Sequence, residues 1–317
     1  MNNLSLKLVL TFVLTLSLFS CKSNNKEIAQ EPIYRIDSIP FTMNENFGKA
    51  KYNKIYIPVQ LKDSATYSFI LDNCCSNTWF QDNLFNTMYD RSNFHAIDTP
   101  SFTASIISFE GHVELKIGSY LFALDTINIT NTELFKKLYH MTTDLKGIIG
   151  CDLFEREIVE VDFDNHLILI HSHLPEKTAT YLTLDLFYGK QFWKSDKMPR
   201  VQFDGFVGKN QEKLTGKFLF DLGAELTSLF PEFNAKLSSD MSQYDSLSWG
   251  YKLLNLTNVH NQTVIGKFGI PEDERNQGLI GMDFIKQFNL VFDYPRGKIY
   301  LQPRENAQPS PYLKLRK

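Results

Sequence analysis

Short runs of apolar residues, each bounded by polar residues or glycine, dominate the chain from about residue 49 onward. Residues 54–61 alternate between apolar and polar side chains, which is typical of a half-buried strand, and residues 67–71 form the returning strand. A short helix is expected to begin near Gln81. Further strands are expected at 102–109, 113–117, 121–129, 158–170 and 181–186, with turns at Glu110-Gly111, Gly118-Ser119 and Asp164-Asn165. The pattern therefore predicts an all-β fold with few short helices.

Two of these apolar runs end abruptly at an aspartate. Phe-Ile-Leu precedes Asp72, and Phe-Leu-Phe precedes Asp221. A carboxylate directly after a buried strand is costly to bury alone, so each of these acids needs a partner or a chemical role. The segments that follow the two aspartates are Asn73-Cys74-Cys75-Ser76 and Leu222-Gly223-Ala224-Glu225.

A second repeated pattern indicates that the chain contains an internal duplication. The segment 147–171 aligns without gaps with 278–302, and the match includes two glycines and two acids in each copy. The matched acids are Asp152 with Asp283, and Asp162 with Asp293. We therefore expect two copies of one lobe. The expected segments are an N-terminal lobe at 49–175, a connector at 176–198, a C-terminal lobe at 199–305 and a tail at 306–317.

Composition narrows the classes of function. The chain has 317 residues, with 33 basic and 36 acidic side chains, so a nucleic-acid partner is not expected. The 26 phenylalanines and 14 tyrosines favour strands. Four cysteines without CxxC spacing and seven scattered histidines do not suggest a zinc site.

The N-terminus predicts export. Lys7 precedes an apolar run from Leu8 to Phe19, which is too short to span a bilayer comfortably and suits a signal peptide. The ending Ser20-Cys21 resembles the lipobox of bacterial lipoproteins, which implies a signal peptide at 1–21 and lipid modification of Cys21. The alternative is a secretory signal with an incidental cysteine. Residues 22–48 are expected to be a polar tether. The absence of aspartate after the cysteine implies, by the same resemblance, the outer membrane of a bacterial cell envelope.

The repeated order of an apolar run, an aspartate and a later apolar-apolar-glycine segment resembles the pepsin-like and retropepsin-like aspartic proteases. The resemblance covers nearly all of 49–303 and implies a two-lobed acid-protease fold. It implies that Asp72 and Asp221 are the catalytic pair. It also implies that six residues support the loops or contact the substrate, namely Cys74, Ser76, Gly150, Gly223, Ala224 and Gly281.

The resemblance implies an endopeptidase that uses two carboxylates and a water molecule. Two adjacent carboxylates share one proton, so one can act as general base while the other polarises the scissile carbonyl. No metal or cofactor is expected. A peptide or protein substrate would bind between the lobes, under a hairpin drawn from about Thr103 to Glu114. A chain with both lobes is expected to be a monomer.

The two aspartate loops depart from the family pattern of Asp, then Thr or Ser, then Gly. Asn73 stands where a hydroxyl group helps to lock the loops together, and Cys74 stands where the family has glycine. Leu222 cannot donate the locking hydrogen bond, and Glu225 adds a third carboxylate. A second hypothesis is therefore a catalytically inactive relative that binds peptide or assembles at the envelope.

The remaining cysteines and acids have structural interpretations. The family fold and an exported location would permit a disulfide from Cys74 or Cys75 to Cys151. The alternative, which we favour, is that all three are buried free thiols. Asp152 and Asp283 follow Gly-x before an apolar segment, and we expect them to be helix N-caps rather than catalytic groups.

Overall fold

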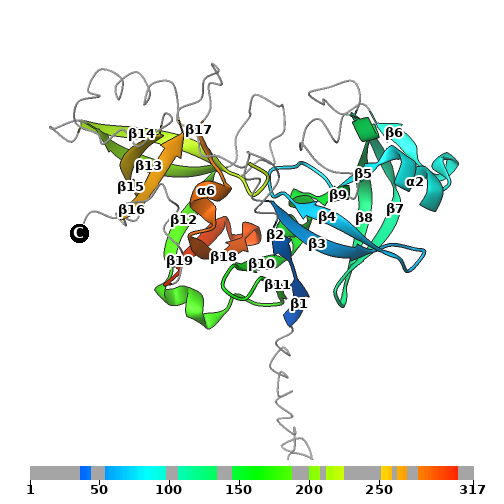
Figure 1. Cartoon of the computed structure of the whole chain (residues 1–317), viewed down its shortest axis with the longest axis horizontal. Helices are drawn as coiled ribbons and strands as arrows, with labels where there is room; N and C mark the ends of the chain where they lie inside the picture. The colour runs from blue at the N-terminus through cyan, green and yellow to red at the C-terminus, as the bar shows by residue number, and fades with distance from the viewer. Residues whose placement is uncertain are drawn as a thin grey trace, which may run out of the picture. The chain divides into compact units, whose positions relative to one another are not determined.

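The computed structural model describes residues 36–43, 54–97, 106–133, 145–187, 200–207, 212–224, 251–258, 263–269 and 278–305. Most of these residues lie in β-strands, with a few short helices between them (Figure 1). The fold is therefore mostly β, as the alternation of apolar and polar positions predicts. Within the described ranges, no helix has the length and apolarity that crossing a bilayer requires.

The first sheet, as far as the structure describes the chain, has eight strands in the order β2-β3-β4-β9-β5-β8-β7-β6. The helix expected near Gln81 is confirmed as α2. The elements of this part are β2 (Thr42–Met43), β3 (Ile55–Gln60), β4 (Thr66–Leu71), β5 (Trp79–Gln81), α2 (Asp82–Met88), η1 (Arg91–Asn93), β6 (His95–Ile97), β7 (Ile106–Ile117), β8 (Tyr120–Thr130) and β9 (Leu145–Ile149).

The second sheet, over the same described residues, has eleven strands, and its main path is β1-β11-β10-β18-β19-β12-β13-β14-β17. Strand β15 pairs with both β13 and β16. The elements are β1 (Ile36–Pro40), α4 (Cys151–Arg156), β10 (Ile158–Asp162), β11 (Leu167–His171), η2 (Glu176–Thr180), β12 (Leu182–Phe187), β13 (Arg200–Val207), β14 (Glu212–Phe220), β15 (Tyr251–Asn258), β16 (Thr263–Gly269), β17 (Gly278–Ile280), α6 (Met282–Ile285), β18 (Phe288–Asp293), η4 (Tyr294–Arg296) and β19 (Lys298–Pro303).

The duplication in the sequence corresponds to a repeated strand arrangement. Strand β4 pairs in parallel with β9, with Leu71 opposite Ile149. Strand β14 pairs in parallel with β17, with Phe220 opposite Ile280. These are equivalent positions of the repeat, and each pair of strands ends immediately before one of the two aspartates. The same local structure therefore positions both aspartates.

The two copies join through equivalent strands. Strands β10 and β18 are antiparallel, and Glu160 of the first lies opposite Val291 of the second. The sequence repeat equates these two residues, so the pairing is centred on equivalent positions. An antiparallel pairing of this kind has local two-fold symmetry, which gives the two aspartate loops equivalent places on either side of it.

Two turn predictions have different outcomes. The turn at Gly118 is confirmed, and this glycine has φ = +63°, a conformation that side chains disfavour. The turn at Glu110-Gly111 is wrong, because β7 runs without interruption and its pairing with β8 shifts register between Glu110 and Val113. A β-bulge uses the same kind of residues as a turn, which explains the error.

The expected covering hairpin is only partly within the described residues. Thr103 lies outside them. From Ile106 to Glu114 the chain belongs to β7, which pairs with β6 on one side and with β8 on the other. This part is an ordinary strand of the sheet, which corrects the expectation for residues 106–114.

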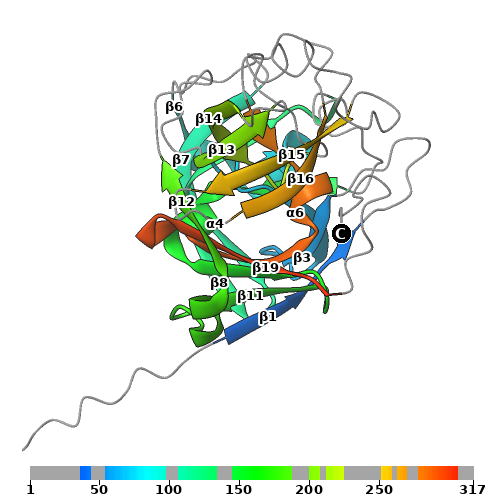
Figure 2. The ribbon, with the colours of Figure 1, turned by 90° about the vertical axis from the view of Figure 1, so that its left-hand side faces the viewer.

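The tether prediction also needs correction, because part of 22–48 forms strands. Strand β1 pairs with β11 along its whole length at the edge of its sheet (Figure 2). Its exposure alternates, with Asp37 and Ile39 buried. The folded part therefore begins before the expected residue 49. Residues 1–35, with the predicted signal peptide and Cys21, lie outside the described ranges.

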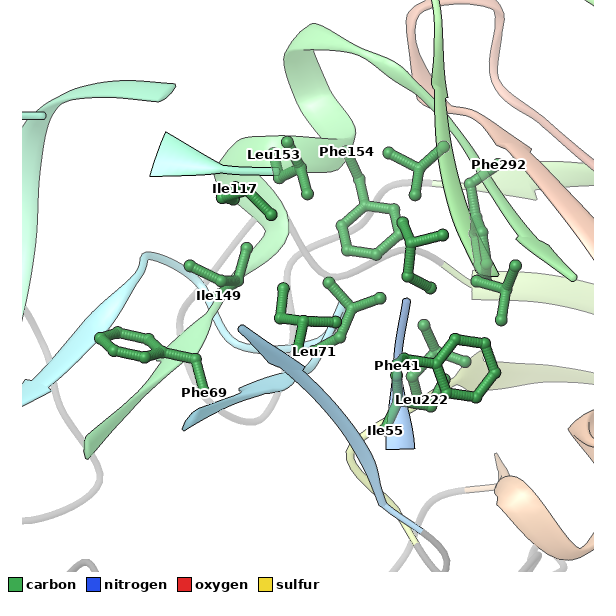
Figure 3. Close-up of a cluster of buried hydrophobic side chains, with 14 of the residues drawn as sticks. Phe41, Ile55, Phe69, Leu71, Ile117, Ile149, Leu153, Phe154, Leu222 and Phe292 are labelled. Atoms are coloured by element: carbon green, nitrogen blue, oxygen red, sulfur yellow. The ribbon is translucent and has the colours of Figure 1, made fainter. Parts of the chain in front are cut away.

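Both copies contribute to one apolar core. The buried cluster contains Phe69 and Leu71 from the first copy and Leu222 and Phe292 from the second. Figure 3 shows these side chains grouped together with Phe154 of α4. A shared core couples the position of one aspartate loop to that of the other.

Candidate active site

The first aspartate loop is held by its own backbone. The N–H of Asp72 donates to the carbonyl of Ile149 at 3.0 Å, which continues the parallel pairing by one residue. The N–H of Cys74 donates to Oδ1 of Asp72 at 2.9 Å, and the N–H of Cys75 donates to the Asp72 carbonyl at 3.2 Å. The carboxylate is buried and fixed by the loop that follows it.

The second aspartate loop repeats this geometry. The N–H of Asp221 donates to the carbonyl of Ile280 at 2.9 Å. The N–H of Gly223 donates to Oδ1 of Asp221 at 2.6 Å, and the N–H of Ala224 donates to the Asp221 carbonyl at 3.3 Å. Each contact has its counterpart in the first loop. The sequence-predicted pair therefore occupies equivalent structural positions.

The two carboxyl groups meet. The side chains of Asp72 and Asp221 lie close enough for a hydrogen bond between them. Two ionised carboxylates have no proton to share, so this hydrogen bond requires that one member is protonated. Burial, followed by the negative charge of Asp72, raises the pKa of Asp221 well above that of an ordinary carboxyl group. The pair can thus hold one base and one acid near neutral pH.

Gly223 permits this close approach. A Cβ atom at this position would overlap both carboxylate oxygens of Asp72. The expectation that Gly223 supports the site is therefore explained by space, because no side chain fits between the second loop and the first aspartate.

Asn73 links the two loops directly. Its Nδ2 donates to the Phe220 carbonyl at 2.6 Å and to the Tyr294 hydroxyl at 2.7 Å, and its Oδ1 accepts from the N–H of Leu222 at 2.7 Å. The side chain is fully buried. At the position where the family has a hydroxyl group, the amide of Asn73 therefore reaches both a donor and an acceptor of the opposite loop.

Leu222 has a different role from its counterpart Asn73. Its side chain is fully buried and belongs to the apolar core (Figure 3). Its backbone N–H donates a hydrogen bond to Oδ1 of Asn73, while its side chain contributes packing. The lock between the described loops therefore comes from a side chain of the first copy.

The three cysteines near Asp72 are free, buried thiols, which confirms the interpretation that we favoured. The N–H of Cys151 donates to the Cys75 carbonyl at 2.7 Å, and its thiol contacts the Ser76 carbonyl at 3.0 Å. The thiol of Cys74 lies 3.5 Å from the Phe220 carbonyl. Burial, followed by the charges of the two aspartates, raises the pKa of the Cys74 thiol well above its usual value. This thiol therefore stays protonated and is a poor nucleophile.

The apolar-apolar-glycine segments pack on the aspartate loops, as expected. A Cβ atom on Gly150 would overlap the Asn77 carbonyl, so the first segment can approach its loop only with glycine at this position. In the second copy Gly281 precedes α6, and the N–H of Met282 donates to the Ala224 carbonyl at 2.9 Å.

Asp152 and Asp283 are not N-caps. The N-cap positions of α4 and α6 are Gly150 and Gly281, so each aspartate lies in the first turn of its helix. Asp152 instead accepts hydrogen bonds from the N–H and the hydroxyl of Thr78, at 2.8 and 2.9 Å. It connects the supporting segment to the end of the Asp72 loop.

Lys54 is a member of the site that the sequence did not single out. Only 4 % of its surface is exposed, and its ammonium group donates to the Gly223 carbonyl of the opposite loop. Its charge lowers the pKa of Asp221, against the effects of burial and Asp72. The available signal was a lysine directly before an apolar strand, which is also an ordinary strand start.

Glu225 lies outside the described residues. Within the described ranges, no group of three or more His, Cys, Asp or Glu side chains could hold a metal ion.

No known protein-family model matches this sequence, and a search of curated proteins finds no significant match.

Proposed function

We propose that this chain is an aspartic-type endopeptidase with a two-lobed acid-protease fold. The observation that carries the proposal is the close approach of Asp72 and Asp221, which two equivalent loops hold in place. Repeated parallel strand pairs, the pairing of equivalent strands β10 and β18, and a shared core support the fold part of the proposal.

The proposed mechanism uses the single proton of the pair. The ionised carboxylate takes a proton from a water molecule as the water oxygen attacks the peptide carbonyl carbon. The protonated carboxyl group donates to the carbonyl oxygen, which becomes the second hydroxyl of a tetrahedral diol. The carboxyl group that took the proton from water then donates it to the amide nitrogen, while the other carboxylate takes a proton from one hydroxyl of the diol as the C–N bond breaks. The products are a carboxylic acid and an amine, and the pair returns to one proton.

The surrounding residues support this chemistry by positioning. Asn73 fixes the separation of the loops, because it binds both a carbonyl and an N–H of the opposite loop. The N–H groups of Cys74 and Gly223 orient one carboxylate oxygen each. Catalysis by two groups depends strongly on such preorganisation.

The proposal is tested by incubating the full-length protein in detergent with a peptide library across pH, followed by mass spectrometry of the products. We expect internal cleavage that Asp72→Asn and Asp221→Asn abolish. Asp125→Asn, at an exposed strand position, is the matched control and should cleave like the wild type. Cleavage that persists unchanged in both site variants would refute the pair. Peptide binding without cleavage would favour the inactive relative.

We also propose that Cys21 carries a lipid that anchors the protein to the outer membrane. The motif Leu-Phe-Ser-Cys after an apolar run supports this assignment. Labelling of expressing bacteria with radioactive palmitate should mark the wild type and Cys151→Ser, and should not mark Cys21→Ser. Equal labelling of all three would contradict the assignment.

A further inference from the structure

Lys54 is buried in a place where a lysine needs a charged partner. It lies directly before β3 and is almost completely shielded from solvent. Burying an ammonium group is unfavourable unless hydrogen bonds and a negative charge compensate it. The ammonium group donates a hydrogen bond to the Gly223 carbonyl, and it also interacts with the charge of Asp221.

The backbone of Gly223 contacts Lys54 and both aspartates. Its N–H donates to Oδ1 of Asp221 at 2.6 Å, and its carbonyl accepts from Lys54. Its Cα lies so close to the Asp72 carboxylate that a Cβ would overlap both oxygens. A shift of this one residue would change the geometry of both acids at once.

We propose that Lys54 is a positioning residue for the carboxylate pair, with its ammonium group fixing the Gly223 peptide and supplying the charge that keeps the pair singly ionised. This inference rests on the proposed function, because single ionisation is the state that the peptidase mechanism requires. A doubly protonated pair would have no base to activate water.

The electrostatic balance at Asp221 supports this role. Within the described residues, the pKa of Asp221 responds to Asp72, to Lys54 and to the hydrogen bond from the Gly223 N–H, which lowers it; the thiol of Cys74 also lies near this carboxyl group. Burial and the charge of Asp72 raise the pKa of Asp221, while the charge of Lys54 lowers it. The thiol stays neutral, because its own pKa is raised. Loss of the ammonium charge should therefore move both proton equilibria of the pair to higher pH.

The first test is the pH dependence of kcat/KM on a cleaved peptide, for the full-length protein. Lys54→Gln keeps an N–H donor for the Gly223 carbonyl and removes the charge, whereas Lys54→Arg keeps both. Lys62→Gln, in the exposed β3–β4 turn, is the matched control. We expect both limbs of the profile to move up by about 1 pH unit in Lys54→Gln. The profile of Lys62→Gln should match the wild type, and Lys54→Arg, which keeps the charge, should keep both limbs at their wild-type pH whatever its absolute kcat/KM.

A second measurement does not depend on cleavage. Carbon-13 NMR of protein labelled at the aspartate carboxyl carbons follows the titration of the pair, with Asp72→Asn and Asp221→Asn for assignment. We expect the same upward shift of the titration in Lys54→Gln. A shifted titration in a protein that cleaves no peptide would retain this inference and reject the proposed function.

Three results would overturn the inference. The first is normal cleavage with an unshifted profile and titration in Lys54→Gln. The second is an equal shift in Lys62→Gln. If Lys54→Gln does not fold, Lys54→Met takes its place in the same comparison. The third result is that neither of these variants folds while Lys54→Arg does, which would mean that the charge is needed for folding rather than for positioning the pair.

Discussion

At the scale of the residue, the side chain of Asn73 determines how the two aspartate loops meet. An amide carries a donor and an acceptor in fixed geometry, so one side chain binds the Phe220 carbonyl and the Leu222 N–H together. A third hydrogen bond, to the Tyr294 hydroxyl, holds the amide from the side of η4. Within residues 221–224, the described part of the second loop, the position equivalent to Asn73 is the apolar Leu222, so the polar side chain of this lock comes from the first loop.

Replacement of Asn73 should affect both stability and cleavage. Asn73→Ala leaves the Phe220 carbonyl and the Leu222 N–H buried without this partner, so the free energy of unfolding should fall by about 3 kcal/mol. Urea unfolding measures this change, and kcat/KM should fall with it. Asn73→Thr should cause an intermediate loss of stability and of kcat/KM, because its hydroxyl group can replace only part of the hydrogen bonding of the amide.

The matched control for this series is Asn83→Ala, at an exposed position of α2. Its effect on stability should remain within about 0.5 kcal/mol. If Asn73→Ala were no more destabilising than Asn83→Ala, the lock would not depend on the amide.

Asp152 should make stability depend on pH. Burial raises the pKa of its carboxyl group to about 6, despite the hydrogen bonds from Thr78. In the unfolded chain the pKa is about 3.9. The native state therefore binds the proton more tightly, and stability is lost as pH rises from about 4 through 6. Asp152→Asn cannot ionise and does not suffer this loss.

Urea unfolding at a series of pH values measures this effect. Between pH 4 and pH 7 the free energy of unfolding of the wild type should fall, relative to Asp152→Asn, by about 2–3 kcal/mol. A difference between the two proteins that does not change with pH would show that the buried carboxyl group titrates normally.

Single residues differed in how far the sequence could predict them. Asp72 and Asp221 were predictable, because a carboxylate after a buried strand is conspicuous and it occurs twice. The roles of Asn73 and Lys54 were not predictable. Both side chains act through contacts with residues that lie at least 147 positions further along the chain. Nothing local distinguishes a cross-linking asparagine from a loop asparagine.

At the scale of the element, the site depends on two parallel strand pairs, β4 with β9 and β14 with β17. Each pair places an aspartate beyond its last paired residue and a glycine-containing segment beside the aspartate loop. Strand β4 was predicted as the returning strand at 67–71, whereas β9, β14 and β17 were singled out as apolar segments without being assigned to strands. The bulge in β7 was not, because Glu110 and Gly111 suit a turn and a bulge equally. Strand β1 was missed, because five residues give a weak periodic signal.

Gly150 tests the packing of the supporting segment on its loop. Gly150→Ala would place a methyl group against the Asn77 carbonyl, where the backbone must move to admit it. We expect a loss of about 2–4 kcal/mol in the free energy of unfolding and a strong loss of cleavage.

Gly297→Ala is the control for this substitution. Gly297 has φ = +65°, and a Cβ atom there would meet nothing within 4 Å. Its replacement should cost about 1–2 kcal/mol from backbone strain alone and should leave kcat/KM unchanged. Equal effects of the two alanines on cleavage would mean that the Gly150 contact does not support the site.

At the scale of the whole molecule, the two copies behave as one folded unit. Residues 35–317 form a single compact unit, and the core contains side chains of both copies. The pairing of β10 with β18 at equivalent residues gives this unit its local symmetry. The sequence repeat predicted the duplication. It could not predict which strands join the copies, because the joining strands resemble other apolar strands.

The central claim is that Asp72 and Asp221 act as one catalytic unit, and comparison of single and double variants tests it most directly. The measurement is kcat/KM for peptide cleavage by the wild type, Asp72→Asn, Asp221→Asn and the double variant. If the two carboxyl groups share one proton in one reaction, each single variant should lose about as much activity as the double variant, roughly 10³-fold or more. Losses that simply multiply in the double variant, or a single variant that retains full activity, would contradict the claim.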